Sequence, residues 1–499
     1  MAHPVIERIV AAVKGVSVKR IAATLLETFT PEILQRRKTV TKRLGHTAYL
    51  DGLRGVAAFC VVLMHLLSYT HPGVEVCYGS LYYWGHVNHS VLSLPFIRAF
   101  VLGGHFAVQL FFVISGYVLP RRLIQLLHEG RREGFIENVH SAMVRRPFRL
   151  FLPILWSTLA FAMSWHMFGL ETPWPAHQAN IILEIVEWIN ESSKFVFFFR
   201  RGDLYTRYNT HSWTIPVELQ GSMFIYLWLF LTHTIDTRRR VLLTLGMVIY
   251  LAIGAAGAWY AGFFAGMLTA ELDMLAADGS TTNIQFPWDG FRRWLNVHRR
   301  IKQTLLHVML VCGLFLAGEP SLDGMNIEGV FEGCIGWETL SKLIPPAYSE
   351  GQYSATYRWF WLFWGAWMVL VAVKEIDWVR WLFETRPSQY LGKHSFSLYF
   401  VHGPMIGILS ERLFYLTAVK QPIDFTSYVR YGPIYDQWHG AAWWPFPDSD
   451  INGLEPNFLF CCAISIPVFL YVAELGTKWF DTPSVAASKW IYLEVNSMR

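Results

Sequence analysis

The chain has 499 residues, of which 53% are hydrophobic and 16% are charged, and its mean hydropathy is +0.30. This composition is typical of polytopic membrane proteins and excludes a string of soluble domains, although the length would allow about three. The net charge of +5 requires no nucleic-acid partner, because Lys and Arg residues in cytoplasmic loops account for it. The six Cys residues are scattered without a paired CxxC, so they indicate neither a zinc site nor a disulfide framework.

The chain begins with a basic, partly amphipathic segment at 1–48, which we expect to lie near the cytoplasmic membrane surface. It lacks the pattern of a cleaved signal peptide. The fold class is an all-α polytopic membrane protein, with one transmembrane domain at 49–485 and a short tail at 486–499. We expect ten transmembrane helices, near 51–70, 103–120, 148–168, 213–237, 241–254, 257–272, 304–318, 356–373, 389–410 and 457–476.

Ten helices place both chain termini on the same side of the membrane. The segments on that side hold 29 of the 42 Lys and Arg residues, and the opposite loops hold 9. Because basic residues concentrate in cytoplasmic loops, we predict that both termini are cytoplasmic. With this topology, two Asn-x-Ser sequons, at Asn88 and Asn190, lie in outer loops. A eukaryotic cell could glycosylate them there, and the sequence does not decide whether it does. Endomembrane and plasma membrane both fit this topology.

The first apolar stretch, YLDGLRGVAAFCVVLMHLLSY at 49–69, carries Arg54 and His65. Residues eleven apart lie on one face of an α-helix, separated by about 16 Å along its axis. Ionisable groups inside a membrane helix are costly and indicate a functional site. The alternative is that Arg54 anchors the helix at the interface while His65 is a packed polar residue.

Two further stretches carry polar groups into the membrane region. RRPFRLFLP, at the cytoplasmic start of the third predicted helix, supplies three arginines, and SWTIPVE supplies Glu218 towards the outer face. Arginine forks suit phosphates, and a histidine is a ready general base, which Glu218 could orient or stabilise. This division suggests a phosphorylated cytoplasmic donor whose reactive end reaches a base nearer the outer face. The alternatives are positive-inside charge for the arginines, a helix cap or interfacial role for Glu218, and an N-cap role for Asp51.

Seven stretches, in order, resemble successive elements of the membrane-bound acyltransferase 3 family and its fungal branch. They are DGLRGVAAFCVVLMH, LFFVISGYVL, RRPFRLFLP, SWTIPVE, FFAGMLTAEL, LGKHSFSLYFVH and AELGTKWFDTPS. The resemblance covers about 49–485. It departs from the family at Gln109, where many members have Asp, and at 221–223, where Gly-Ser-Met replaces the common Glu-Gln-Phe-Tyr continuation. These departures leave the acceptor class open.

The resemblance implies a ten-helix O-acyltransferase that uses cytoplasmic acyl-CoA, often acetyl-CoA, as co-substrate. The acceptor would be a hydroxyl of a glycan, lipid or small metabolite, commonly at the far membrane face, and no permanent cofactor or metal is expected. By this resemblance His65 is the catalytic base, and the acyl-CoA phosphates are bound by Arg54, Arg145, Arg146 and Arg149. Structural or orienting roles are expected for Asp51, Ser115, Gly116, Tyr117, Trp213, Tyr399 and His402, with small Ser115 and Gly116 lining the path of the donor.

Two other functions are compatible with these residues. In a transporter or channel, His65 and the arginines would line a permeation path, and broken helices paired across two halves would favour it, but the sequence contains no such symmetry. A catalytically silent scaffold is disfavoured by the presence of both Arg54 and His65. The sequence does not determine the acceptor, the acyl chain length or the oligomeric state, and a homo-oligomer is compatible with it.

Overall fold

The computed structural model describes residues 29–32, 44–71, 73–82, 85–170, 172, 177–197, 204–277, 284–323, 325–348, 356–420, 443–448 and 452–497. Most of the predicted amphipathic segment at 1–48 therefore lies outside the described residues. Within them, the only sheet is an antiparallel pair of two-residue strands, β1 (Leu81–Tyr82) and β2 (His86–Val87). The all-α fold class is confirmed for this part of the chain.

The helices follow one another in the order that the apolar stretches predict. The long ones are α3 (Ala48–Ser68), α5 (Gly104–Val118), α7 (Arg132–Phe168), α8 (Ile181–Val196), α9 (Thr214–Thr232), α10 (Thr237–Ile249), α11 (Ala258–Ala277), α13 (Arg299–Ala317), α16 (Arg358–Glu375), α18 (Arg386–Met405), α20 (Pro456–Gly476) and α21 (Thr482–Ser497). The shorter ones are α4 (Ile97–Val101), α6 (Arg121–His128), α12 (Asp289–Val297), α14 (Ile327–Phe331), α15 (Trp337–Ser341), α17 (Asp377–Glu384) and α19 (Glu411–Leu416). Short turns include the 3-10 helix η3 (Thr210–Trp213) and the π-helical turns η4 (Tyr250–Gly254), η6 (Ile406–Ser410) and η8 (Thr477–Asp481).

Six helical segments in the described part are long and apolar enough to cross a membrane. They are Ala48–Ser68, Gly104–His128, Arg132–Phe168, Thr210–Thr232, Arg299–Ala317 and Pro456–Ser497. The pair formed by α16 and α17, bent by 94°, would be a seventh. The chain is thus a multi-helix membrane protein, while the count of ten and the cytoplasmic termini stay predictions. The difference of three arises because α10 is too short, and α11 and α18 are too polar, to qualify by length and composition alone.

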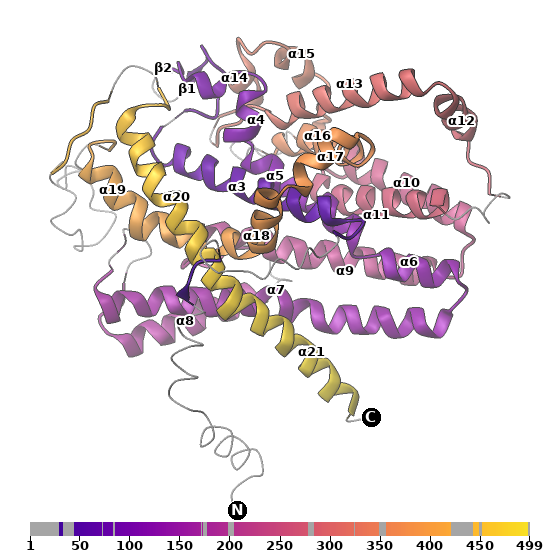
Figure 1. The fold of residues 1–499 in the computed structure, drawn as a ribbon, viewed down its shortest axis with the longest axis horizontal. Helices are drawn as coiled ribbons and strands as arrows, with labels where there is room; N and C mark the ends of the chain where they lie inside the picture. Colours follow the sequence, from indigo (N-terminus) through magenta and orange to yellow (C-terminus); the bar gives the residue numbers. More distant parts are fainter. Residues whose placement is uncertain are drawn as a thin grey trace, which may run out of the picture.

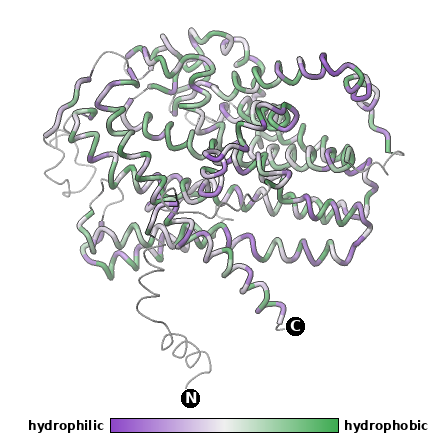
Figure 2. The backbone as a smooth tube through the Cα atoms, in the orientation of Figure 1, coloured by the Kyte–Doolittle hydropathy of each residue, from purple (hydrophilic) through white to green (hydrophobic). Residues whose placement is uncertain are grey.

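Many of the long helices, among them α3, α7, α9, α11 and α13, run along the long dimension of the molecule, whereas α20 and α21 cross it obliquely (Figure 1). Helices α6 and α12, from predicted inner segments, lie at the right of this view, whereas α19 and the β1–β2 pair, from predicted outer loops, lie at the left. Hydrophobic residues predominate in the central helices, and α12 is largely hydrophilic (Figure 2). This arrangement agrees with the predicted alternation of the loops between two sides.

Glycines bring α3 and α18 into backbone contact. A Cβ on Gly55 would overlap the backbone of Gly392, and a Cβ on Gly392 would overlap the Asp51 carbonyl. Small residues allow this close approach between membrane helices. A second contact between the two helices, His65–His402, lies ten residues after the Gly55–Gly392 contact in both helices, so the two helices run in the same direction. This packing places the α18 residues of LGKHSFSLYFVH beside the α3 residues that the sequence singles out.

The predicted outer loops are cross-linked, contrary to the expectation that the cysteines form no disulfide. Cys77 is bonded to Cys334, 257 positions away in the sequence. A long-range pair has no local spacing signature, which is why the cysteine pattern does not predict it. Disulfides persist in oxidising compartments, so this pair agrees with an extracellular or lumenal location for both loops.

The two sequons differ in accessibility. The Asn88 side chain is buried, and its amide nitrogen donates to the Val76 carbonyl and to Ser93 Oγ. Glycosylation at Asn88 would break these hydrogen bonds in the folded protein. Asn190 is exposed on α8, so it is the sequon that remains available.

A polar cluster lies near the C-terminal end of α3. The Glu75 carboxylate accepts a hydrogen bond from Ser68 Oγ at 2.8 Å and lies 3.5 Å from His105 Nε2, which in turn contacts Arg358 at 2.6 Å. Burial alone would raise the pKa of the Glu75 carboxyl, but the His105 hydrogen bond and charge, the Arg358 charge and the Ser68 hydroxyl lower that pKa to about 2. The cluster fixes the loop that follows α3.

Candidate active site

A cavity of about 660 Å³ lies between α3, α5, α7, α9 and α18. Its wall is partly apolar, with Phe111 and Phe112 from α5 among the lining residues. The charged residues that line it are Arg54, Arg146, Arg149, Lys393, Asp51, Glu218 and Asp481. Three of the four predicted phosphate-binding arginines, from two separate stretches of sequence, therefore share one cavity.

Two of these arginines have no partner among the residues that the structure describes. Neither Arg54 on α3 nor Arg149 on α7 has a hydrogen bond or an ion pair within the described part of the chain. Arg54 is half-buried, and Asp481 is the nearby carboxylate that partly offsets the charge of Arg149. Unpaired guanidinium groups in a cavity can bind a phosphate through two parallel hydrogen bonds. The cavity thus presents two arginine forks with the chemistry to bind anions.

The third arginine is held within the protein. Arg146 forms an ion pair with Glu218, and its Nε donates to Ser222 Oγ at 3.0 Å. Glu218 and Ser222 lie one turn apart on α9, so α9 clamps the Arg146 side chain. The expectation that Glu218 orients His65 is corrected by this pairing, since the carboxylate lies in the cavity with Arg146. Ser222, one of the departures from the family pattern, has a role in the clamp.

The fourth predicted arginine does not reach the cavity. Arg145 is exposed, its Nε donates to the Ser141 carbonyl at 3.2 Å, and its guanidinium lies 5.8 Å from the centre of the Tyr492 ring. The three arginines of RRPFRLFLP therefore do not act as one cluster. Helix periodicity does not separate them, because Arg145 lies only four residues from Arg149; Arg145 stays out of the cavity because its side chain turns to Ser141 and Tyr492 instead.

Phe111, Thr214 and Tyr399 line part of the cavity, and we call this part its floor. Thr214 Oγ1 donates to the Tyr399 hydroxyl at 2.7 Å, and that hydroxyl donates to the His211 main-chain carbonyl. The Tyr399 ring lies 5.7 Å from the ring of His402. Tyr399 therefore both lines the cavity and packs beside the histidine His402.

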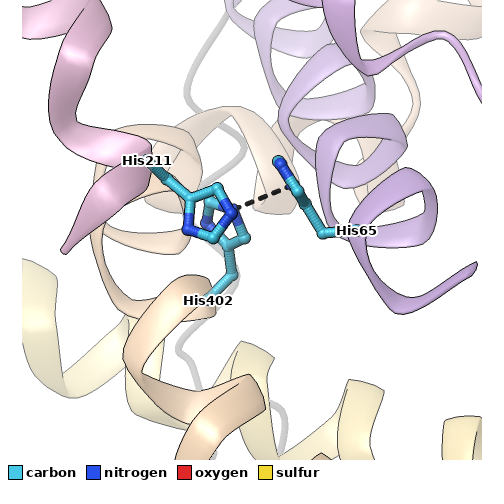
Figure 3. A group of neighbouring side chains, drawn as sticks. All are labelled: His65, His211 and His402. Carbon is cyan, nitrogen blue, oxygen red and sulfur yellow. Dashed lines mark hydrogen bonds between the residues drawn. The ribbon is translucent and has the colours of Figure 1, made fainter. Parts of the chain in front are cut away.

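Three histidines from three separate segments gather beside this floor: His65 of α3, His211 of η3 and His402 of α18. Their rings face one another (Figure 3), with centroid separations of 4.0 Å for His65–His211, 5.0 Å for His65–His402 and 4.8 Å for His211–His402. His402 is fully buried. His65 is about 16 Å along α3 from Arg54, as the helix geometry predicts.

The hydrogen bonds fix the tautomers of two of these rings. His402 Nδ1 lies 2.6 Å from the Tyr399 carbonyl, so it carries the proton and donates it. His402 Nε2 is then an acceptor, and it lies 3.2 Å from His65 Nδ1, which also lies 2.9 Å from the Val61 carbonyl. Both partners of His65 Nδ1 are acceptors, so this nitrogen is protonated. The lone pair of His65 is left on Nε2, the atom that can take a proton.

His211 is absent from the sequence-based site and is placed by its neighbours. Asn209 Nδ2 donates to the Phe400 carbonyl at 2.9 Å, and Asn209 Oδ1 accepts from the His211 main-chain nitrogen. With the Tyr399 hydroxyl, these bonds attach η3 to α18. In the sequence, the one feature that could have indicated His211 is that it directly precedes the SWTIPVE stretch. Lys393, also absent from the prediction, lies in LGKHSFSLYFVH and lines the cavity.

The remaining predicted residues divide between the cavity and the packing around it. Asp51 and Ser115 line the cavity, and Asp51 is not the N-cap of α3, because Thr47 occupies that position. Gly116 faces α11, where a Cβ would overlap the Phe263 carbonyl, so it does not line the path of a donor. Two others serve packing: the Tyr117 hydroxyl donates to Asp273, and the Trp213 ring packs on Trp259 and Trp359.

Comparison with known proteins gives the chain's relatives. The acyltransferase 3 family, described as an acyltransferase domain, matches residues 47–446. The chain is similar to the O-acetyltransferase PaAT-1 of Phomopsis amygdali, with 27% identity over 90% of this chain and 85% of the relative. It is also similar to the acyltransferase clz18 of Cochliobolus lunatus (24% identity, 88% of this chain, 94% of the relative) and to the acyltransferase R4 of Phoma sp. (22%, 73% and 84%). No solved structure gives a significant match.

Proposed function

Because the chain belongs to the acyltransferase 3 family and is an acyltransferase, we propose that it moves an acyl group, most simply acetyl, from acyl-CoA to a hydroxyl oxygen. The name of the Phomopsis relative, an O-acetyltransferase, supports both the acetyl group and the oxygen acceptor. The observation that carries the proposal is a cavity lined by Arg54 and Arg149 whose wall also includes Tyr399, the neighbour of His402 in the histidine cluster. A donor with phosphates at one end and a thioester at the other fits this layout.

The donor phosphates would bind Arg54 and Arg149, whereas Lys393, which also lines the cavity, is ion-paired with Glu32. The reacting carbon must then reach His65, about 16 Å further along α3. The extended pantetheine arm is of this length, about four to five residue lengths of chain at ~3.5 Å each. To pass the floor, the arm must displace the side chains of Phe111 and Tyr399.

The proposed chemistry uses the free lone pair of His65. As the acceptor oxygen attacks the thioester carbonyl, His65 Nε2 takes the hydroxyl proton. The new C–O bond forms, the C–S bond breaks, and the proton passes to the departing CoA sulfur. General-base catalysis of this kind contributes about 10²- to 10⁴-fold. His402 keeps His65 in the required tautomer by accepting from its Nδ1, which makes His402 a positioning residue.

The test uses the full chain in lipid nanodiscs with acetyl-CoA and a panel of hydroxyl-bearing sugars, lipids and small metabolites. Release of the CoA thiol and the mass gain of an acetyl group identify transfer. We expect His65→Ala to abolish transfer by at least 10²-fold while CoA still binds. Wild-type turnover by His65→Ala would remove His65 from the mechanism, and failure of the wild type to bind CoA would overturn the function itself.

A further inference from the structure

The three-histidine cluster has the composition of a metal site. One ring nitrogen from each of His65, His211 and His402 lies within 4.8 Å of the others. In the described part of the chain, no carboxylate or thiol belongs to this group. Three imidazoles with room for a further ligand are a common Zn²⁺ coordination set. Zinc holds nitrogen ligands at about 2.0–2.1 Å, so tetrahedral geometry separates these nitrogens by about 3.4 Å.

The cluster is close to this geometry before any ion binds. One pair, His65 Nδ1 and His402 Nε2, is 3.2 Å apart, and the ligand nitrogens of all three residues lie within 4.8 Å of one another, so small side-chain movements would bring them to the zinc geometry. To coordinate through Nδ1, His65 would move the proton of that nitrogen to Nε2. Metal-bound histidines usually donate their second ring nitrogen to a carbonyl, which fixes the tautomer. His402 Nδ1 already donates to the Tyr399 carbonyl, which leaves its Nε2 free to turn to a metal.

An independent observation concerns His211. Its Nδ1 is buried and has no hydrogen-bond partner, and no hydrogen bond of its ring occurs within the described residues. A buried polar nitrogen without a partner is costly, and native proteins rarely leave one. The ring nevertheless lies against His65 with a centroid separation of only 4.0 Å. A bound cation would supply the partner that this ring lacks.

We propose that His65, His211 and His402 bind one divalent transition-metal ion, with Zn²⁺ as the ion their chemistry fits best, and that this binding reversibly inhibits acyl transfer. The inhibitory part rests on the proposed function, and metal binding does not. A neutral imidazole has a single nitrogen lone pair. Whichever nitrogen of His65 coordinates the ion, that lone pair is no longer available to take a proton from the acceptor.

The first experiment measures the metal directly. The full chain, with any affinity tag removed, is reconstituted in nanodiscs, stripped with EDTA and titrated with Zn²⁺ or Co²⁺. We expect one Zn²⁺ per chain and the visible d–d spectrum of tetrahedral Co²⁺. His211→Phe, of similar ring volume, should lose both signals. His211→Cys replaces one metal ligand by another and should keep binding, with an added sulfur-to-cobalt charge-transfer band.

A control excludes adventitious surface binding. His307 is a half-buried histidine of α13, remote from the cluster, and lies in the same surface hollow as Cys312. His307→Gln should therefore leave the zinc stoichiometry unchanged. Loss of the ion in His307→Gln, or an unchanged stoichiometry in His211→Phe, would overturn the site. Size-exclusion elution of each variant identifies misfolded protein, and the His211→Cys spectrum still decides the question if His211→Phe does not fold.

The second experiment tests inhibition. At saturating Zn²⁺, acyl transfer by the wild type should fall at least tenfold and return after EDTA is added. Unchanged or increased activity with the site occupied would overturn the inhibitory role. If no acyl transfer is found under any condition, the proposed function fails, but the stoichiometry and the cobalt spectrum still report whether the metal site exists. The two failures are thus distinguishable.

Discussion

Replacing each cavity arginine by lysine would separate phosphate recognition from simple positive charge. Arg54→Lys and Arg149→Lys keep the charge but remove the planar fork that can make two parallel hydrogen bonds to a phosphate. Arg145→Lys is the matched control, because Arg145 belongs to the same basic stretch as Arg149 but lies outside the cavity. All three variants have the same net charge, so a change in the electrostatic field of the whole protein cannot explain a difference between them.

The expected loss follows from one hydrogen bond to a charged group, worth about 1.5–3 kcal/mol. At about 1.4 kcal/mol for each factor of ten, CoA binding should weaken about 10- to 150-fold. Arg54 is half-buried, so we expect its variant in the upper part of this range, whereas Arg149 is exposed and should fall near tenfold. For Arg145→Lys we expect a change of less than about twofold.

The assay is calorimetric titration of CoA itself, which binds without reacting and so requires no knowledge of the acceptor. Repeating it at two salt concentrations separates screened surface attraction from binding inside the cavity. The reasoning is refuted if Arg145→Lys weakens binding as much as the cavity variants. It is also refuted if Arg54→Lys binds CoA as tightly as the wild type does.

Three further predictions follow from the contacts around the cavity. His402→Ala should lower turnover without changing CoA affinity, and His402→Gln, whose amide oxygen can still accept from His65, should restore part of the loss; equal effects on kcat and CoA affinity would contradict the positioning role. Ser115→Leu should fill the cavity and weaken CoA binding, whereas Gly116→Leu should lower thermal stability through its clash with α11, by about 1–3 kcal/mol or more; a stable Gly116→Leu protein with weakened CoA binding would restore the channel interpretation. The pKa of Glu75 is lowered from its ordinary 4.5 to about 2, so its carboxylate stabilises the fold fully above pH 4.5 and progressively less as the pH falls towards 2; the stability difference between the wild type and Glu75→Gln should shrink over that range, and a difference that grows there would contradict the sign.

The parts of the site that the sequence predicts are local in the chain. Arg54 and His65 share one uninterrupted helix, so their spacing follows from helix geometry alone. Arg146 and Arg149, three residues apart, lie on one helical face for the same reason. Charge and hydropathy also indicate which helix ends are basic, and this suffices to predict a phosphate site at one end of the bundle.

What the sequence does not predict depends on contacts between distant segments. His402 contacts His65 because Gly55 and Gly392 fix the register of α3 against α18. The residue pattern within either helix alone does not predict this register. The partner of Glu218 and the orientation of Gly116 likewise depend on which neighbouring helix each faces. An isolated membrane helix offers several faces to its neighbours, and the choice is made only when all the helices pack.

Tyr399 connects the two halves of the site through two chemically different groups. Its side-chain hydroxyl donates to the His211 carbonyl and accepts from Thr214, while its main-chain carbonyl accepts from His402 Nδ1. A donor arm that crosses the floor must displace the Tyr399 ring, which breaks the hydroxyl contacts. The carbonyl belongs to the backbone of α18, so the bond to His402 survives, and with it the tautomer of His65. Tyr399→Phe removes only the hydroxyl, and we therefore expect it to preserve His65-dependent turnover within about threefold, much less than the loss of a general base would cost. A loss as large as that of His65→Ala would show that the hydroxyl takes part in the reaction itself.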